Sequence, residues 1–192
     1  MKTDSVKCLT PEVKWYEKNL PPSVIKYKID DDKLMKSLME IVDNDGDRMY
    51  HKTNLFCAMS GYKSHIYSQY KERYDVILDI IDSILDEQNF NLSVDDIWVA
   101  KYESGEYARK HAHAPSNWSF CLYLNEGDGF PPLEIDDYGN VNPEKGLLVF
   151  FPGTLNHEVK SKEFEGSRYV CAGNIHPKSH MRTIRVGATI NV

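Results

Sequence analysis

From about residue 96 onward, short apolar segments alternate with clusters of Gly, Pro, Asn and Asp, and no other feature limits the possible folds of this chain as strongly. Apolar segments of this length, ended by turn-forming residues, are typical of β-strands in a two-sheet architecture. The pattern therefore predicts a β-sandwich or jelly roll. The expected strands cover residues 97–102, 118–124, 133–135, 147–151, 158–161, 169–175 and 183–190.

Two amphipathic helices are expected before these strands, at residues 33–42 and 74–85. In both segments apolar residues return every three or four positions, which places them on one face of a helix. The acidic run at 30–32 precedes the first helix, where carboxylates interact favourably with the helix dipole. An alternating run at 24–29 adds one further strand. We expect the helices to pack on one face of the β-structure.

These elements predict a mainly β fold with flanking helices (α+β), in a single domain over residues 1–192. Residues 1–95 would supply an N-terminal strand and the supporting helices, and residues 96–192 the jelly-roll core. A chain of 192 residues, 41% of them hydrophobic, is long enough to bury one substantial core. No segment approaches the roughly 20 consecutive apolar residues of a membrane helix. We therefore expect no membrane partner and a cytoplasmic location.

Charge and cysteine content argue against two further classes of protein. The net charge of −6 gives no general attraction to a polyanion, so no nucleic-acid partner is expected. The four cysteines have no close pair in sequence, which argues against a disulfide framework or a zinc ribbon. Cys121 and Cys171 stand in apolar runs, and we expect both in the core.

Three histidines carry the strongest functional signal. His111 and His113 are two positions apart, so on a β-strand both side chains would point to the same face. His157 follows a strand and a turn that would return to the same end of a sandwich. Three imidazoles would hold a metal ion and leave positions open for substrate or oxygen, as in catalytic sites. For the pair alone, a surface loop without a ligand role is the competing interpretation.

An ordered set of motifs extends this signal over the C-terminal half. Along the chain it comprises Tyr102, Gly105, Tyr107, His111, the run Cys121-Leu-Tyr-Leu-Asn125, Phe151-Pro152, His157 and Arg168. In this order the set resembles the 2-oxoglutarate- and Fe(II)-dependent dioxygenases, in particular their prolyl-hydroxylase-like branch. The resemblance implies a double-stranded β-helix (jelly roll) buttressed by N-terminal helices, with Fe(II) and 2-oxoglutarate as cofactors.

His113 departs from the common pattern of that branch, which has an aspartate or glutamate at this position. The His-x-His form resembles a subgroup of small oxygenases, some of them virus-encoded, and implies His111, His113 and His157 as metal ligands. Two histidines and a carboxylate leave Fe(II) with one net positive charge, whereas three neutral imidazoles leave two. A 2-oxoglutarate dianion would then bring the centre to neutrality. Three imidazoles also suit zinc.

The resemblance assigns further residues to the cosubstrate. Arg168 would pair with the distal carboxylate of 2-oxoglutarate, and the Tyr123 hydroxyl would bind the same group. Tyr102 and Asn174 are expected to line the same cavity as cofactor-binding residues. From the residues alone, Arg168 could instead point to solvent at the start of a strand.

The resulting hypothesis is a dioxygenase that uses O2 and 2-oxoglutarate to hydroxylate an unactivated C–H bond, with a peptidyl proline as the substrate that the branch suggests. One alternative is a three-histidine cupin-type dioxygenase that binds its substrate directly, through Arg168. The other is a jelly-roll binding module without activity. A fold does not fix a substrate, so protein and small-molecule substrates both stay open. Residues 60–70 and 136–145 are expected to frame the opening, the second as a mobile lid.

Overall fold

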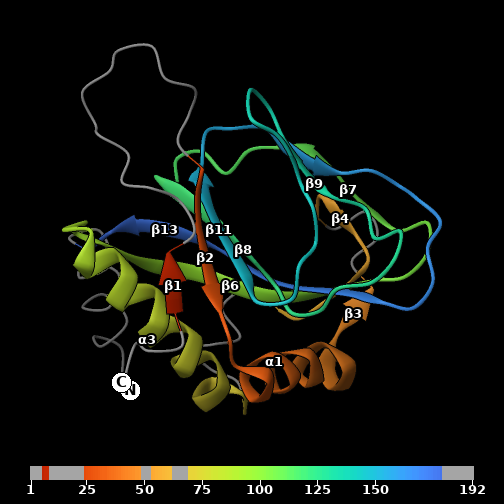
Figure 1. Cartoon of the computed structure of the whole chain (residues 1–192), viewed down its shortest axis with the longest axis horizontal. Coiled ribbons are helices and arrows are strands. Elements are labelled where there is room, and N and C mark those ends of the chain that lie inside the picture. Colours follow the sequence, from red (N-terminus) through yellow and green to blue (C-terminus); the bar gives the residue numbers. More distant parts are fainter. Residues whose placement is uncertain (1–5, 9–23, 49–52, 62–68, 179–192) are drawn as a thin grey trace, which may run out of the picture.

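Two curled antiparallel sheets form the body of the molecule, and two helices cover the outer face of the larger sheet (Figure 1). The computed structural model describes residues 6–8, 24–48, 53–61 and 69–178. The strand expected at 183–190 and most of the predicted opening segment at 60–70 lie outside these ranges.

The larger sheet has eight strands and the smaller sheet five, and every pairing between neighbours is antiparallel. The order in the larger sheet is β1 (Val6–Cys8), β2 (Ile25–Ile29), β11 (Leu147–Pro152), β8 (Trp118–Tyr123), β13 (Arg168–Pro177), β6 (Leu92–Tyr102), β5 (Ala58–Met59) and β3 (Asp47–Arg48). The order in the smaller sheet is β10 (Gly139–Val141), β9 (Leu133–Ile135), β12 (His157–Val159), β7 (Tyr107–His111) and β4 (Leu55–Phe56).

From β6 to β13 the chain passes back and forth between the two sheets. The strands β6, β8, β11 and β13 belong to the larger sheet, and the segments between them contribute β7, β9, β10 and β12 to the smaller sheet. Such a path is that of a jelly roll. The predicted fold class, a mainly β jelly roll with flanking helices, is confirmed.

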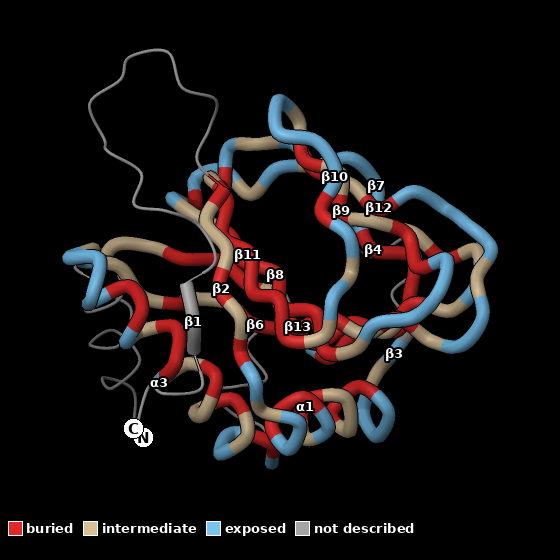
Figure 2. Tube along the Cα trace, viewed as in Figure 1, coloured by how far each residue is buried: buried red, intermediate tan, exposed pale blue. Residues whose placement is uncertain are grey.

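Alternation along the strands of the larger sheet divides the core into two layers. On β8, Phe120 and Leu122 face the helices, while Cys121 and Tyr123 face the smaller sheet. Side chains on successive strand residues point to opposite faces, so one strand supplies both layers. Figure 2 shows the buried residues concentrated along β8, β11 and β13. The layer between the sheets holds the cavity described below.

The helices α1 (Asp32–Asp45) and α3 (Lys71–Glu87) confirm both predicted helices. The side chain of Asp31 caps α1, because its Oδ1 accepts a hydrogen bond from the Leu34 N–H at 2.9 Å. The predicted apolar stripes are buried against the larger sheet. They comprise Leu34, Leu38, Ile41 and Val42 of α1 and Ile77, Ile80, Ile81, Ile84 and Leu85 of α3.

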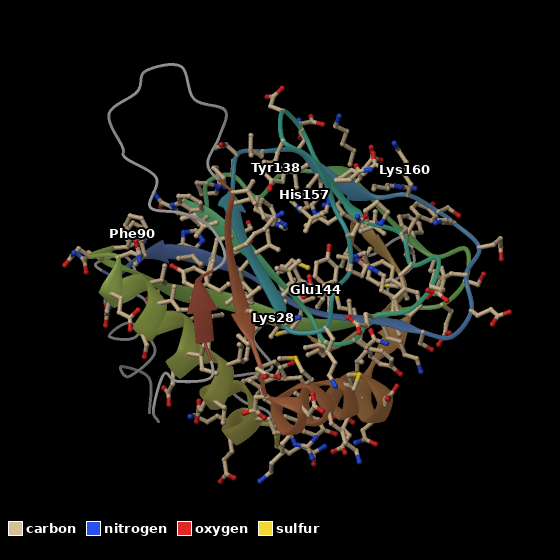
Figure 3. All side chains as sticks on the ribbon, viewed as in Figure 1. Lys28, Phe90, Tyr138, Glu144, His157 and Lys160 are labelled. Carbon is tan, nitrogen blue, oxygen red and sulfur yellow. The ribbon has the colours of Figure 1, made fainter. Side chains whose placement is uncertain are left out.

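The N-terminal half contributes more than support. Strand β2 pairs with β11, and β4 pairs with β7, so segments before residue 96 complete both sheets of the jelly roll. Lys28 of β2 also forms an ion pair with Glu144, in the segment before β11 (Figure 3). The predicted division placed all jelly-roll strands after residue 96 and so left out β4. A strand of two residues is too short to show an alternating pattern in the sequence. The single-domain boundary itself stays a prediction.

Three other expectations have clear outcomes. The segment at 136–145, expected as a mobile lid, contains strand β10, which pairs with β9. Cys121 and Cys171 are buried and free, as expected. None of the helices in the described ranges is long and apolar enough to cross a membrane.

Replacing Ile81 by alanine should measure what the helix–sheet layer contributes to stability. Ile81 is fully buried between α3 and the larger sheet. An Ile→Ala change at such a site lowers the free energy of unfolding by about 2–5 kcal/mol. Asp79→Ala on the exposed side of the same helix should change it by no more than about 0.5 kcal/mol. Urea unfolding followed by circular dichroism tests both, and equal effects would contradict the described packing.

Candidate metal centre

The pairing of β7 with β12 brings His111 and His157 side by side. The two residues are direct partners in the ladder, and their ring centroids lie 4.4 Å apart. The next pair is Val159 with Ala108, so three steps along β7 match two along β12. This bulge changes the phase of β7 so that both Ala108 and His111 line the space between the sheets.

His113 completes the cluster from two residues beyond the end of β7. Its backbone N–H donates to the Gly153 carbonyl at 2.7 Å, which holds the extended segment against the turn before β12. Its ring centroid lies 4.8 Å from that of His111 and 4.9 Å from that of His157. One potential ligand nitrogen from each ring lies within 4.8 Å of the others. The structure therefore brings the three predicted ligands together. It does not support the alternative in which His111 and His113 are a surface pair apart from His157.

Hydrogen bonds orient two of the three rings. The Nδ1 of His111 lies 2.6 Å from the Arg109 carbonyl oxygen, and the Nδ1 of His157 lies 3.1 Å from the Leu155 carbonyl oxygen. A carbonyl oxygen can only accept, so in each ring Nδ1 carries the proton. The lone pair is then on Nε2, and such anchoring is the usual arrangement of histidine metal ligands.

Burial also keeps the imidazoles in the neutral form that binds metals. It lowers the pKa of His113 to about 3, with further lowering from the neighbouring His157 and His111. It lowers the pKa of His157 to about 4, again with a contribution from His111, and lowers the pKa of His111 as well. A neutral imidazole needs to lose no proton before it coordinates. At pH 7 the chain therefore presents three uncharged nitrogen donors.

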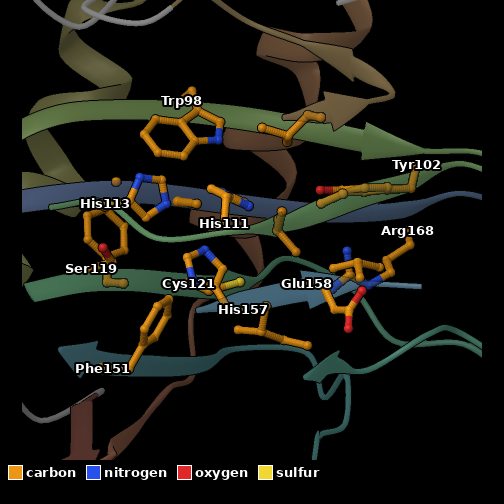
Figure 4. Close-up of a pocket in the computed structure, with 18 residues that line it drawn as sticks. Trp98, Tyr102, His111, His113, Ser119, Cys121, Phe151, His157, Glu158 and Arg168 are labelled. Carbon is orange, nitrogen blue, oxygen red and sulfur yellow. The ribbon is translucent and has the colours of Figure 1, made fainter. Parts of the chain in front are cut away.

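The histidines line one end of a cavity between the sheets. Its empty volume is about 510 Å³ when the space that opens to solvent is included. Figure 4 shows the histidine cluster at one end and Arg168 with Tyr102 at the other. Most of the other side chains that line the cavity are apolar, among them Leu55, Ala108, Leu133, Val159 and Val170, and Glu158 is the carboxylate in the lining.

Arg168 is buried at the far end of the cavity. Only 1% of the residue is exposed, so the alternative that it points to solvent is wrong. Its guanidinium lies between two aromatic rings, 4.9 Å from the centroid of Tyr102 and 5.3 Å from that of Tyr123. Its Nε and Nη1 have no hydrogen-bond partner within the described part of the chain. Cation–π contacts stabilise such a charge only in part.

Glu158 also lines the cavity, but in the described part of the chain no carboxylate lies within ion-pair distance of Arg168. Burial raises the pKa of Tyr102 and of Tyr123 well above the usual value, so both phenols stay protonated despite the nearby guanidinium. Burial likewise raises the pKa of the Cys121 thiol to about 11. Within the residues that the structure describes, the arginine is therefore a buried cation without a counter-ion.

The other predicted cosubstrate residues lie at different depths of the same layer. Tyr102 is the direct strand partner of Arg168. The hydroxyl of Tyr123 donates to the Val141 carbonyl at 2.8 Å, so its proton is engaged and its ring faces the guanidinium. Asn174 is six residues from Arg168 on β13, which is ~20 Å along a strand. Their roles toward 2-oxoglutarate stay predictions.

Trp98, Ser119 and Cys121 also line the cavity, a position that was not predicted for them from the sequence. The alternation of side chains along a strand would have predicted that they face the cavity. Trp98 shares a face of β6 with Tyr102, and Ser119 and Cys121 share a face of β8 with Tyr123, at even spacing from the tyrosines.

Comparisons with known proteins agree with this geometry. No family model and no curated protein sequence matches the chain. A prolyl-4-hydroxylase from Pseudomonas putida is similar in structure, with 18% identity and a TM-score of 0.61 over 81% of this chain and 92% of that one. A viral collagen prolyl hydroxylase from Paramecium bursaria Chlorella virus-1, solved as its 2-oxoglutarate complex, has 17% identity and a TM-score of 0.59 over 78% and 94%.

A third structure is a Trichoplax adhaerens prolyl hydroxylase in complex with a peptide fragment of hypoxia-inducible factor. It has 14% identity and a TM-score of 0.57 over 78% of this chain and 81% of that one. The chain has the prolyl-hydroxylase fold. The predicted resemblance is therefore confirmed at the level of the fold, and the prolyl-hydroxylase fold in this chain contains a His-x-His pair and a distant histidine that converge.

Removal of one imidazole should abolish metal uptake. His111→Ala and His157→Ala each leave two donors, and we expect the affinity for Fe(II), Co(II) or Zn(II) to fall by more than the roughly 10- to 100-fold lost with an outer-sphere partner. Isothermal titration calorimetry of the metal-free chain measures this. His176→Ala is the matched control, because His176 bonds Ser116 outside the cluster. Unchanged uptake in His111→Ala would mean that the cluster is not the metal site.

Proposed function

We propose that this protein is an Fe(II)- and 2-oxoglutarate-dependent oxygenase that hydroxylates an unactivated C–H bond. One observation carries the proposal: a buried guanidinium without a counter-ion lies at one end of a cavity whose other end holds three convergent imidazoles. A dicarboxylate that chelates a metal at one end and offers a free carboxylate at the other suits both ends. The similarity to a hydroxylase solved with 2-oxoglutarate supports this assignment.

The residues of the cavity fit these groups by charge and by chemistry. His111, His113 and His157 would hold Fe(II), which three neutral nitrogen donors suit. Arg168 would bind the distal carboxylate of 2-oxoglutarate, since a guanidinium can make two parallel hydrogen bonds to one carboxylate. Its free Nε and Nη1 atoms are the donors for that pair.

When bound, Fe(II) and 2-oxoglutarate supply the oxidising chemistry, which consumes O2 and leaves succinate and CO2 beside the hydroxylated product. The protein orients the cosubstrate by fixing one of its carboxylates at Arg168. The rings of Tyr102 and Tyr123 enclose that charge pair and exclude water, which strengthens it. The carbonyls of Arg109 and Leu155 fix the orientation of two ligand rings.

The other two interpretations predict different binding. A three-histidine dioxygenase without 2-oxoglutarate would use Arg168 for a substrate carboxylate and would show no affinity for 2-oxoglutarate. A binding module without activity would take up no metal. A peptidyl proline as the substrate follows from the resemblance to prolyl hydroxylases and is part of this proposal as its preferred substrate class.

Arg168→Met should separate the role of the arginine in binding from its effect on stability. The variant loses two hydrogen bonds to a charged group, each worth about 1.5–3 kcal/mol, so the affinity for 2-oxoglutarate should fall at least ~100-fold. Without ligand the variant should be as stable as the natural chain or more stable, because an apolar side chain of similar size replaces an unpaired buried charge.

Anaerobic titration of the Fe(II)-loaded chain with 2-oxoglutarate, followed by the visible charge-transfer band, measures binding, and thermal unfolding measures stability. Arg168→Lys keeps the charge without the planar fork and should give intermediate affinity. If the natural chain binds Fe(II) but shows no such band, the proposed cosubstrate is wrong.

His113→Asp tests whether the third imidazole is a metal ligand. An aspartate at this position restores the ligand set that is common in the resembling branch, so metal binding and succinate formation should both persist. His113→Ala lacks any donor there and should lose both. Succinate release per chain, measured by mass spectrometry in the presence of Fe(II) and O2, compares the two variants. Metal binding and succinate formation that persist in His113→Ala would count against His113 as a ligand.

A further inference from the structure

The three-histidine cluster contains no anionic side chain. Within the described part of the chain, the group that can hold a metal ion consists of His111, His113 and His157. An imidazole that binds a metal is uncharged. A divalent metal would therefore keep its full charge of two among these donors, whereas a carboxylate in place of His113 would cancel one unit of it.

The cavity around the cluster adds little negative charge. Among the described residues that line it, Glu158 is the carboxylate. This side chain interacts with lysines of the smaller sheet: the pKa of Lys110 is raised by Asp136 and further by Glu158, and the pKa of Lys160 by Glu134 and further by Glu158. The charge of Glu158 is therefore shared with two surface lysines.

The three rings also differ in their support. The carbonyl oxygens of Arg109 and Leu155 accept hydrogen bonds from the Nδ1 atoms of His111 and His157. Such a bond raises the basicity of a ligating imidazole. Among the described residues no carbonyl oxygen plays this part for His113. At this position a metal would meet a donor that is uncharged and is not strengthened by a hydrogen bond.

Uncharged donors favour the lower oxidation state of iron. Oxidation of Fe(II) to Fe(III) transfers one electron to an oxidant such as O2 and adds one positive charge to a site enclosed between two sheets. Adding that charge costs more when a net charge of two becomes three than when one becomes two, and surroundings of low polarity increase the difference. Arg168, buried in the same cavity, is a further positive charge. Ligand identity and burial are the means by which a protein sets such a reduction potential.

We infer that His113 sets the oxidation-state preference of the metal centre, because three uncharged imidazoles hold the iron as Fe(II) in the presence of O2. The inference rests on the proposed function, since it concerns the iron of that site. It gives the His-x-His pair a role that a carboxylate in place of His113 would not have. The centre keeps its iron reduced between turnovers without an added reductant.

Reduction potentials of the iron-loaded full chain test this inference. The natural chain and His113→Asp are loaded with Fe(II) without 2-oxoglutarate and titrated electrochemically under anaerobic conditions. The high-spin Fe(III) signal in electron paramagnetic resonance measures the oxidised fraction. We expect the equilibrium constant for oxidation to be at least ~10-fold larger in His113→Asp, which corresponds to a potential lower by at least ~59 mV for a one-electron couple. In air, the natural chain should retain Fe(II) longer than His113→Asp, as measured with an Fe(II)-specific chelator.

Matched variants separate charge from other changes. His113→Asn has the size and the oxygen donor of aspartate without its charge, so its potential should lie closer to that of the natural chain than to that of His113→Asp. Asn140→Asp adds the same charge at an exposed position of β10 and should leave the potential unchanged. If His113→Asp does not fold, His111→Asp places a carboxylate at another ligand position and should lower the potential in the same way.

Two results would overturn the role of His113: equal potentials in the natural chain and His113→Asp, or equally lowered potentials in His113→Asn and His113→Asp. A natural chain that takes up no iron would overturn it as well. If the potentials are equal but 2-oxoglutarate binds the Fe(II)-loaded chain, the redox role is wrong and the proposed oxygenase stands. If the potentials differ as expected but the charge-transfer band is absent, the redox role stands and the proposed cosubstrate is wrong.

Discussion

The uncompensated charge of Arg168 is the constraint on which the rest of the site depends. A guanidinium between two sheets is costly unless an anion meets it, and the surrounding phenols and thiol are held in their neutral forms. The chain thus keeps a destabilising group in its core, where an apolar residue would pack as well. Strained or unpaired groups of this kind concentrate at functional sites. The cavity is best understood as an anion site that is completed by its ligand.

His113 changes the electrostatics of that ligand site. With an aspartate in its place, a divalent metal, Arg168 and a dianionic cosubstrate would sum to zero net charge. With three neutral imidazoles the same set keeps one positive charge, because the charge of Arg168 has to be counted together with that of the metal. The expected neutrality holds only when the charges of the metal, its ligands and 2-oxoglutarate are counted without that of Arg168. Among the residues that line the cavity, Glu158 is the carboxylate that could offset the remaining charge.

Local patterns in the sequence predicted most of the fold and part of the site. The apolar stripes of α1 and α3 and the strands β6, β8, β9, β11 and β13 follow from periodicity, which acts over a few residues. The strands β3, β4 and β5 were not predicted from the sequence, because two residues are too few to show a period. The bulge that turns both Ala108 and His111 inward also depends on pairing with a distant strand. Burial of Arg168 was undecidable from its neighbours, because its surroundings come from β6 and β8.

Strand β13 sets the spacing of the whole site. Arg168, Val170, Ala172 and Asn174 alternate onto its inner face, so one strand carries the charged end, the apolar middle and the amide-bearing end. A slip of one residue would turn all four toward the helices. Gly173 helps to fix this register, because a Cβ there would lie 2.3 Å from the Asp96 carbonyl oxygen and 2.5 Å from the Phe120 ring. The close approach that only glycine permits holds β6 against β13 beside the paired residues Asp96 and Asn174, and so connects the packing of the sheet to the alignment of the inner face of β13.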